Sequence, residues 1–200
     1  MKRSIQAASM VAGLLLMAVT AFAQSVEDGA AAYRAGDMQT AFEIFTKHAS
    51  EGDSIAQHNL GYMYENGGGV RKSLRHAYDW YEKAAEQGHV HSMYKASYAY
   101  AIGEGRERDL DIQREWLYRA AERGHGAAFN NLSVIYSDGR GVPKDLVKAY
   151  MLARLGADMG DGIAGLQLES YNLPSLMTPR QIAEANRRAD AWRVGMPLPR

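Results

Sequence analysis

The stretch that decides the fold reads Ala56-Gln-His-Asn-Leu60-Gly61-Tyr-Met-Tyr64, then Asn66-Gly67-Gly-Gly69-Val70, then Ala77-Tyr-Asp-Trp80-Tyr81-Glu-Lys83-Ala84-Ala85 and Gly88. Its first part spaces Ala56, Leu60 and Tyr64 four residues apart, on one face of a helix. Glycines then interrupt this spacing, because Gly67 and Gly69 favour the positive φ values that reverse a chain. The stretch therefore predicts two helices joined by a glycine turn.

The same pattern recurs every 36 residues along the chain. When the repeats are aligned at this spacing, four sets of residues occupy equivalent positions: Gly52, Gly88, Gly124 and Gly160; Tyr64, Tyr100 and Tyr136; Gly67, Gly103 and Gly139; and Trp80, Trp116 and Leu152. A repeat of this length indicates helical hairpins that stack side by side, each covering the apolar face of the next. The sequence predicts an all-α solenoid with full repeats at 53–88, 89–124 and 125–160, without strands.

Each repeat is expected to contain a first helix, near 54–64 in the first unit, and a second helix near 74–87. The second helix should bury Ala77, Trp80, Tyr81, Ala84 and Ala85. Gly61 is expected to let the two helices approach closely, and Trp80 and Tyr81 to fill the space further along.

Shorter units flank the three repeats. Residues 24–52 predict a capping helical hairpin whose loop is Gly36-Asp37. Residues 161–200 predict a partial repeat, with another first-type helix at 161–171, and a final helix after Thr178-Pro179. That helix should turn Ile182, Ala185, Ala189 and Trp192 toward the core and a polar face outward.

These columns resemble the Sel-one-like repeat, a relative of the tetratricopeptide repeat, from about Ala30 to Trp192. The second unit departs from the pattern with Arg106 at a valine position, and the third with Leu152 at the tryptophan position. The resemblance implies a right-handed α/α solenoid that acts as an adaptor or scaffold. Cysteine-rich members of that family have been linked with β-lactamase-like activity, but this chain has no cysteine, so that activity is not transferred to it.

Residues 1–23 have the pattern of a secretory signal peptide. Lys2 and Arg3 precede an apolar run from Ala7 to Val19, and small residues stand at Ala21 and Ala23. The run is too short to favour a transmembrane anchor. We therefore expect cleavage between Ala23 and Gln24 and a periplasmic protein with no stable membrane anchor after cleavage.

Composition and motifs exclude several classes of function. The 23 basic residues balance the 23 acidic ones, so no field of one sign is available to hold a nucleic acid. The absence of cysteine excludes a disulfide framework, a thiolate zinc site and a cysteine nucleophile. No catalytic motif is present, and the repeat explains the glycines of 67–69 better than a phosphate loop does. The chain is predicted not to be an enzyme and to need no cofactor.

The pair His89 and His91 invites a metal hypothesis. However, His89 has an equivalent in the next repeat, His125, and each follows a repeated glycine, which is typical of a residue that connects two helices. In addition, side chains two residues apart diverge on a helix. No metal site is therefore predicted. The acidic pair Asp109 and Asp111 is interpreted as a helix start rather than as general acid machinery.

The face opposite the core of each first helix is the candidate binding surface. In the first repeat this rule selects Ile55, His58 and Tyr62. Shifts of 36 residues extend the surface to His91, Tyr94, Tyr98, Asn130 and Val134. By resemblance to the tetratricopeptide superhelix, these residues would line its concave side, where tyrosines anchor peptides or stack on sugars. The alternative is that the tyrosines simply pack between neighbouring helices.

Three functions compete. The first is a periplasmic scaffold that binds a peptide or partner protein in its concave groove. The second is a binder of cell-envelope glycans such as peptidoglycan, and the third is a β-lactamase-like or cell-wall hydrolase. The polar final helix favours a monomer.

Overall fold

The structure is a computed structural model that describes residues 24–160 and 173–200. All regular structure in these two ranges is helical, which confirms the all-α prediction. The expected signal peptide at 1–23 and the expected helix at 161–171 lie outside the described residues. The elements are α2 (Val26–Arg34), α3 (Met38–Ser50), α4 (Ser54–Asn66), α5 (Leu74–Glu86), α6 (Val90–Ile102), α7 (Leu110–Ala121), α8 (Gly126–Asp138), α9 (Leu146–Asp158), the 3₁₀ turn η1 (Leu173–Leu176) and α11 (Pro179–Ala191).

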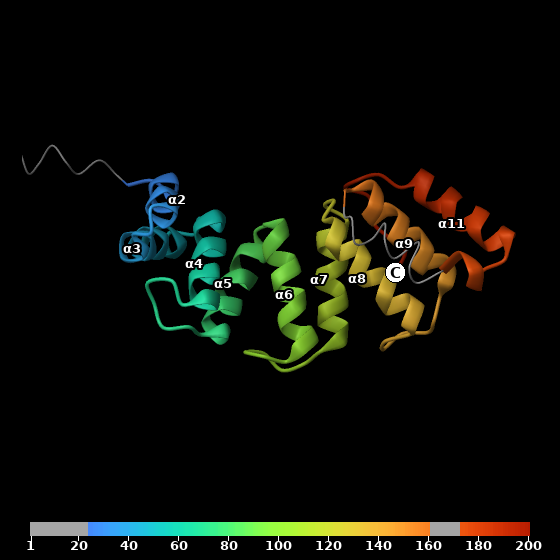
Figure 1. Cartoon of the computed structure of the whole chain (residues 1–200), viewed down its shortest axis with the longest axis horizontal. Coiled ribbons are helices and arrows are strands. Elements are labelled where there is room, and N and C mark those ends of the chain that lie inside the picture. The colour runs from blue at the N-terminus through green and yellow to red at the C-terminus, as the bar shows by residue number, and fades with distance from the viewer. Residues whose placement is uncertain (1–23, 161–172) are drawn as a thin grey trace, which may run out of the picture.

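The helices follow one another along the long axis of the molecule, from α2 at one end to α11 at the other (Figure 1). The closest pairs are α4 with α5, α6 with α7 and α8 with α9, which are the predicted hairpins. Each hairpin also packs on the next, through α5 with α6 and α7 with α8. This consecutive packing is that of an α/α solenoid. Within the described ranges, no helix combines the length and apolar character needed to cross a bilayer.

The turn glycines end the first helix of each repeat. Gly67, Gly103 and Gly139 are the C-caps of α4, α6 and α8, with φ values of 79°, 75° and 78°. A side chain with a Cβ is strained in this left-handed conformation. The following helices begin at polar N-caps, and Asp109 accepts hydrogen bonds from the amides of Asp111 and Ile112, as expected of a helix start.

Small residues allow the two helices of a hairpin to approach closely, as predicted for Gly61. Tyr81 is fully buried, but Trp80 is only partly buried and packs beneath the ammonium group of Lys83, 3.9 Å from the ring centre. Tyr78, which was not expected in the core, is fully buried instead. The reason is that α5 packs against both α4 and α6, so two of its faces are covered and not one.

The end of the chain returns from α11 to the body of the solenoid (Figure 1). Thr178 and Gln181 form the predicted capping box of α11, and Trp192 closes the core beyond it. The segment 193–200 then runs back to α7, where the amides of Gly195 and Leu198 donate to the backbone and the side chain of Glu122. This return places Arg200 beside α7, where it donates to Glu115, 85 positions away in sequence.

Candidate functional site

The predicted binding surface is exposed over α4 and α6. Tyr62 and Tyr98 expose 42% and 50% of their surface, and Ile55 and His91 are also exposed. His58 and Tyr94 lie between them and are half-buried. These six residues, Ile55, His58, Tyr62, His91, Tyr94 and Tyr98, are called here the tyrosine–histidine face.

The tyrosines of this face differ in how they are held. The Tyr62 ring meets the Tyr33 ring of α2 edge to face, with the centroids 6.0 Å apart. Tyr94 stacks on the His125 imidazole at 4.7 Å, and its hydroxyl accepts a hydrogen bond from Asn131. Tyr94 therefore supports the packing of α6 against α8, whereas Tyr62 and Tyr98 present the largest aromatic surfaces to solvent.

Asn130 and Val134 do not extend the exposed surface onto α8. Asn130 is only 7% exposed, so the expectation that it faces outward is wrong. Val134 is half-buried. The reason is that α8 is more enclosed than its counterparts, with seven buried residues against five in α4 and five in α6. A shift of 36 residues along the sequence preserves the phase of the helix. It does not predict how much of each helix is covered by neighbouring segments.

Histidines of successive repeats contact one another. The ring of His58 stacks on that of His89 at 4.4 Å, and its Nδ1 lies 2.9 Å from the Ser92 hydroxyl. His91 Nδ1 lies 3.2 Å from His125 Nε2. His89 and His125 precede α6 and α8 as connector residues, as the sequence indicated. Burial, reinforced by the neighbouring His89, His91 and Lys95, lowers the pKa of His58 to about 4.

The carboxylate of Glu65 joins the helices that carry the tyrosine–histidine face to α5. Glu65 of α4 accepts from the Tyr81 hydroxyl of α5 at 2.6 Å and from the Lys95 ammonium of α6 at 2.9 Å. Since these bonds link two repeats, the spacing between Tyr62 and Tyr98 is set by the packed framework. Among the described residues, no three histidine or carboxylate side chains converge in an arrangement able to hold a metal ion.

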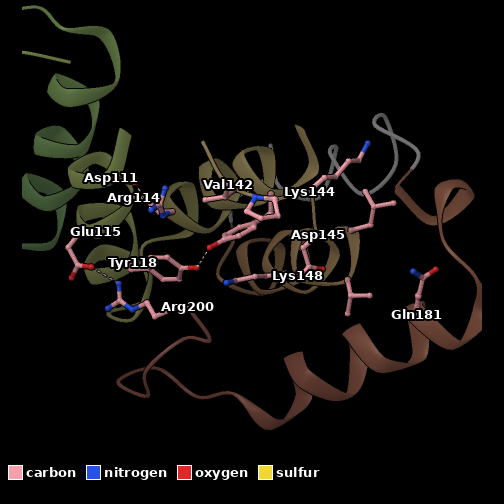
Figure 2. A pocket seen from close by; sticks show the side chains of 14 residues that line it. Asp111, Arg114, Glu115, Tyr118, Val142, Lys144, Asp145, Lys148, Gln181 and Arg200 are labelled. Atoms are coloured by element: carbon pink, nitrogen blue, oxygen red, sulfur yellow. Dashed lines mark hydrogen bonds and ion pairs between the residues drawn. The ribbon is translucent and has the colours of Figure 1, made fainter. Parts of the chain in front are cut away.

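A cavity that the sequence did not predict lies between α7, α9 and the returning end of the chain (Figure 2). It is a cavity of about 920 Å³, and its charged wall contains Arg114, Lys148 and Arg200 around the ring of Tyr118. The only sequence signal was Lys148, a cation near the start of a helix that has Ile112 at the equivalent place one repeat earlier. Arg200 could not be assigned to the cavity, because no periodic pattern fixes the path of the last residues.

The family model described as Sel1 repeat matches residues 54–89, 90–125 and 127–161. Among solved structures, the chain is similar to a Sel1 repeat protein from Oxalobacter formigenes, with a TM-score of 0.65 and 29% identity over 82% of this chain and 84% of that one. It is also similar to c5321, a protective antigen of uropathogenic Escherichia coli with an SLR fold, with a TM-score of 0.66 and 30% identity. That match covers 75% of this chain but 32% of the longer antigen. Comparison with curated protein sequences gives no match.

The matched repeats span more than half of the chain, and they coincide with the three helical hairpins α4–α5, α6–α7 and α8–α9. The solved relatives share the same helical architecture. The chain is therefore a member of the Sel1 repeat family.

Proposed function

We propose that this chain is a periplasmic interaction scaffold that holds a peptide segment or partner protein on the tyrosine–histidine face. Proteins of the Sel1 repeat family generally serve as protein-interaction scaffolds, and the family is generally non-catalytic. The observation that carries the proposal is the exposure of Tyr62 and Tyr98 at equivalent positions of two successive repeats. Large exposed aromatic side chains on a rigid framework bind partners at a low entropic cost.

The periplasmic location is supported by the N-terminal sequence. A basic start, a short apolar run and Ala21-Phe22-Ala23 precede the first residue of the mature chain, Gln24. Fractionation of cells that express the full chain tests this part of the proposal. Recovery in the periplasmic fraction with Gln24 as the N-terminal residue supports it, and an uncleaved chain in the cytoplasmic fraction contradicts it.

Binding on the tyrosine–histidine face is tested with the double variant Tyr62→Ala/Tyr98→Ala. Tyr94 is left in place because it stacks on His125 and its removal would disturb the packing. The matched control is Ile112→Ala/Leu176→Ala, which removes two exposed apolar side chains elsewhere. We expect the tyrosine variant to lose partners that the wild type and the control recover from a periplasmic extract. Equal recovery by all three proteins would contradict the proposal.

A glycan ligand is the second candidate, because the flat exposed faces of Tyr62 and Tyr98 can also stack on sugar rings. Cosedimentation with purified peptidoglycan at low salt separates the two ligands. Binding that the tyrosine double variant loses favours the glycan, and its absence leaves the peptide or protein ligand. We do not propose a hydrolytic role. Hydrolysis of a chromogenic β-lactam by the protein faster than in buffer alone would contradict this conclusion.

A further inference from the structure

The cavity between α7, α9 and the end of the chain is built from residues that the tyrosine–histidine face does not use. Its walls come from α7, the end of α8, the loop 142–145, the start of α9, Gln181 and Arg200. The tyrosine–histidine face lies on the first helices α4 and α6 instead. The two sites can therefore be changed independently.

Lys148 is the central charge of this cavity. The residue is only 5% exposed, and its ammonium lies 4.0 Å from the centre of the Tyr136 ring and 5.5 Å from that of Tyr118. Figure 2 shows the side chain extending from α9 toward Tyr118. No carboxylate pairs with this ammonium among the described residues, and Asp145 accepts from the Lys148 amide as the N-cap of α9. A buried cation without an anion is costly, and an anionic ligand would remove that cost.

Arg114 adds a second donor without a partner. Its Nη2 pairs with Asp111 at 2.7 Å, but its Nη1 is buried in the cavity wall and makes no hydrogen bond in the described part of the chain. On the other side of the Tyr118 ring, the Arg200 guanidinium lies 4.4 Å from the ring centre and pairs with Glu115 at 2.7 Å. Asp111 and Glu115 are thus paired with the two arginines and Asp145 caps α9, while Lys148 and Arg114 Nη1 have no anionic partner among the described residues.

Two phenols are hydrogen-bonded to each other in the cavity wall. The hydroxyls of Tyr118 and Tyr136 lie 2.7 Å apart, and Tyr118 is also 3.2 Å from the carbonyl of Pro199. Burial, together with the hydrogen bond to Tyr136, raises the pKa of Tyr118, so the phenol stays protonated. Because the Pro199 carbonyl can only accept, Tyr118 donates to it and Tyr136 donates to Tyr118, so both phenolic protons are used within the cavity wall.

The balance of charge and apolar surface defines the class of ligand. Four cationic residues line the cavity, Arg114, Lys144, Lys148 and Arg200, against three acidic ones, Asp111, Glu115 and Asp145. One excess positive charge matches a monoanion better than a phosphate dianion. The remaining wall is apolar, formed by Val142, Pro143, Leu146 and Val147. We propose that this cavity binds a carboxylate carried on an apolar peptide segment, with Lys148 and Arg114 as the charged donors.

Amide chemical shifts of the ¹⁵N-labelled mature protein test this site. The probes are N-acetyl-leucine, its neutral amide and inorganic phosphate. We expect N-acetyl-leucine to shift amides of 142–148 in a saturable way, the neutral amide to bind at least tenfold more weakly, and phosphate to cause no saturable shift. Equal binding of acid and amide, a stronger response to phosphate, or no response to any probe would each overturn the proposal.

Variants of Lys148 and Arg114 test whether these residues bind the carboxylate. Lys148→Met should weaken binding of N-acetyl-leucine at least tenfold, yet leave the free protein at least as resistant to heat as the wild type, because an unpaired buried charge is removed. Lys47→Met, which makes the same charge change on the exposed surface of α3, should leave binding unchanged. If Lys148→Met does not fold, Arg114→Gln replaces it and should also lose affinity. Wild-type affinity in a folded Lys148 or Arg114 variant would contradict the assignment.

The source of the carboxylate is distinguished by two short peptides. Acetyl-Ala-Leu with a free C-terminus offers only an α-carboxylate, and acetyl-Ala-Glu-Leu-amide offers only a side-chain carboxylate. Saturable binding of either peptide supports a carboxylate site and identifies the source, and failure of both contradicts a peptide ligand. This test does not depend on whether the Tyr62→Ala/Tyr98→Ala variant loses its partners, because that variant changes a different surface.

Discussion

Gly61 of α4 lies directly against the ring of Tyr81 in α5. A Cβ placed on Gly61 would be 2.9 Å from two carbons of that ring and 3.0 Å from the carbonyl oxygen of Ala77. The equivalent positions in the next repeats are Ser97 and Ser133, which are also buried. A small residue at this column therefore sets the distance between the two helices of each hairpin.

Replacement of Gly61 by alanine should destabilise the protein, although alanine is the better helix former. The added methyl group forces Tyr81 or α5 to move, and overpacking of this kind costs about 1–3 kcal/mol. Urea unfolding measures the change. The same substitution in a Tyr81→Leu background should cost less, because the colliding ring is gone. An equal cost in both backgrounds would show that the Gly61–Tyr81 contact is not the cause.

Gly105 should tolerate alanine less well than Gly36 does. Both glycines have positive φ values, 73° and 83°, so alanine is strained by about 1–2 kcal/mol at either position. A Cβ at Gly105 would also lie 2.9 Å from the amide nitrogen of Arg75 in the preceding repeat, whereas Gly36 has open space around it. Urea unfolding of Gly105→Ala and Gly36→Ala measures the difference. Equal losses would mean that the turn of the second repeat is not packed on α5.

Arg106, which departs from the valine of the repeat pattern, should contribute to stability through ion pairs. Its guanidinium binds Asp79 and Glu82 of α5, each at 2.7 Å. Arg106→Met should lower the free energy of unfolding by about 1 kcal/mol, and less at high salt because the ions screen the pairs. Arg140→Met removes a more exposed pair, with Asp138 at the end of α8, and should have a smaller effect. A loss that does not depend on salt would contradict an electrostatic role for Arg106.

Stability should fall as the pH is lowered from about 6.5 to about 4. The pKa of His58 is about 4 in the folded chain against an ordinary value of 6.5, so the unfolded chain binds more protons in this window. Protonation then favours unfolding, and the stability present above pH 6.5 is lost progressively as the pH approaches 4. Urea unfolding of the wild type and His58→Asn across this range measures the effect.

The asparagine variant should show a smaller dependence on pH, because the side chain can still bond to Ser92 but does not titrate. His76→Asn, a substitution on the exposed surface of α5, serves as the control and should keep the wild-type dependence. His89, whose pKa is also lowered by burial, accounts for part of the dependence that remains in His58→Asn. Identical pH profiles for the wild type and His58→Asn would contradict the burial of a neutral imidazole at this position.

The 36-residue period was sufficient to predict the helices, their turns and the exposure of Tyr62 and Tyr98, because these features depend on helix phase and on glycine conformation. It failed for Tyr78 and Asn130, which are buried by helices of neighbouring units. Phase alone does not reveal how many neighbours a helix has.

The carboxylate cavity was not predictable for a different reason. Tyr118 and Tyr136 occupy ordinary positions of their repeats, and the cavity is completed by Arg200, which reaches α7 through a segment without periodicity. Only the packed chain brings these residues together. Non-repetitive ends of a repeat protein thus add sites that the repeat pattern does not contain.

Site-specific photo-crosslinking in the periplasm tests the proposed interaction surface most directly. A benzophenone side chain at Tyr98 would stand on the tyrosine–histidine face, and one at Ile112 would stand at an exposed position of α7. The proposed function predicts that a polypeptide is captured from position 98 and not from position 112. Capture from position 112 alone, or equal capture from both positions, would contradict the claim that the first helices of the repeats hold the partner.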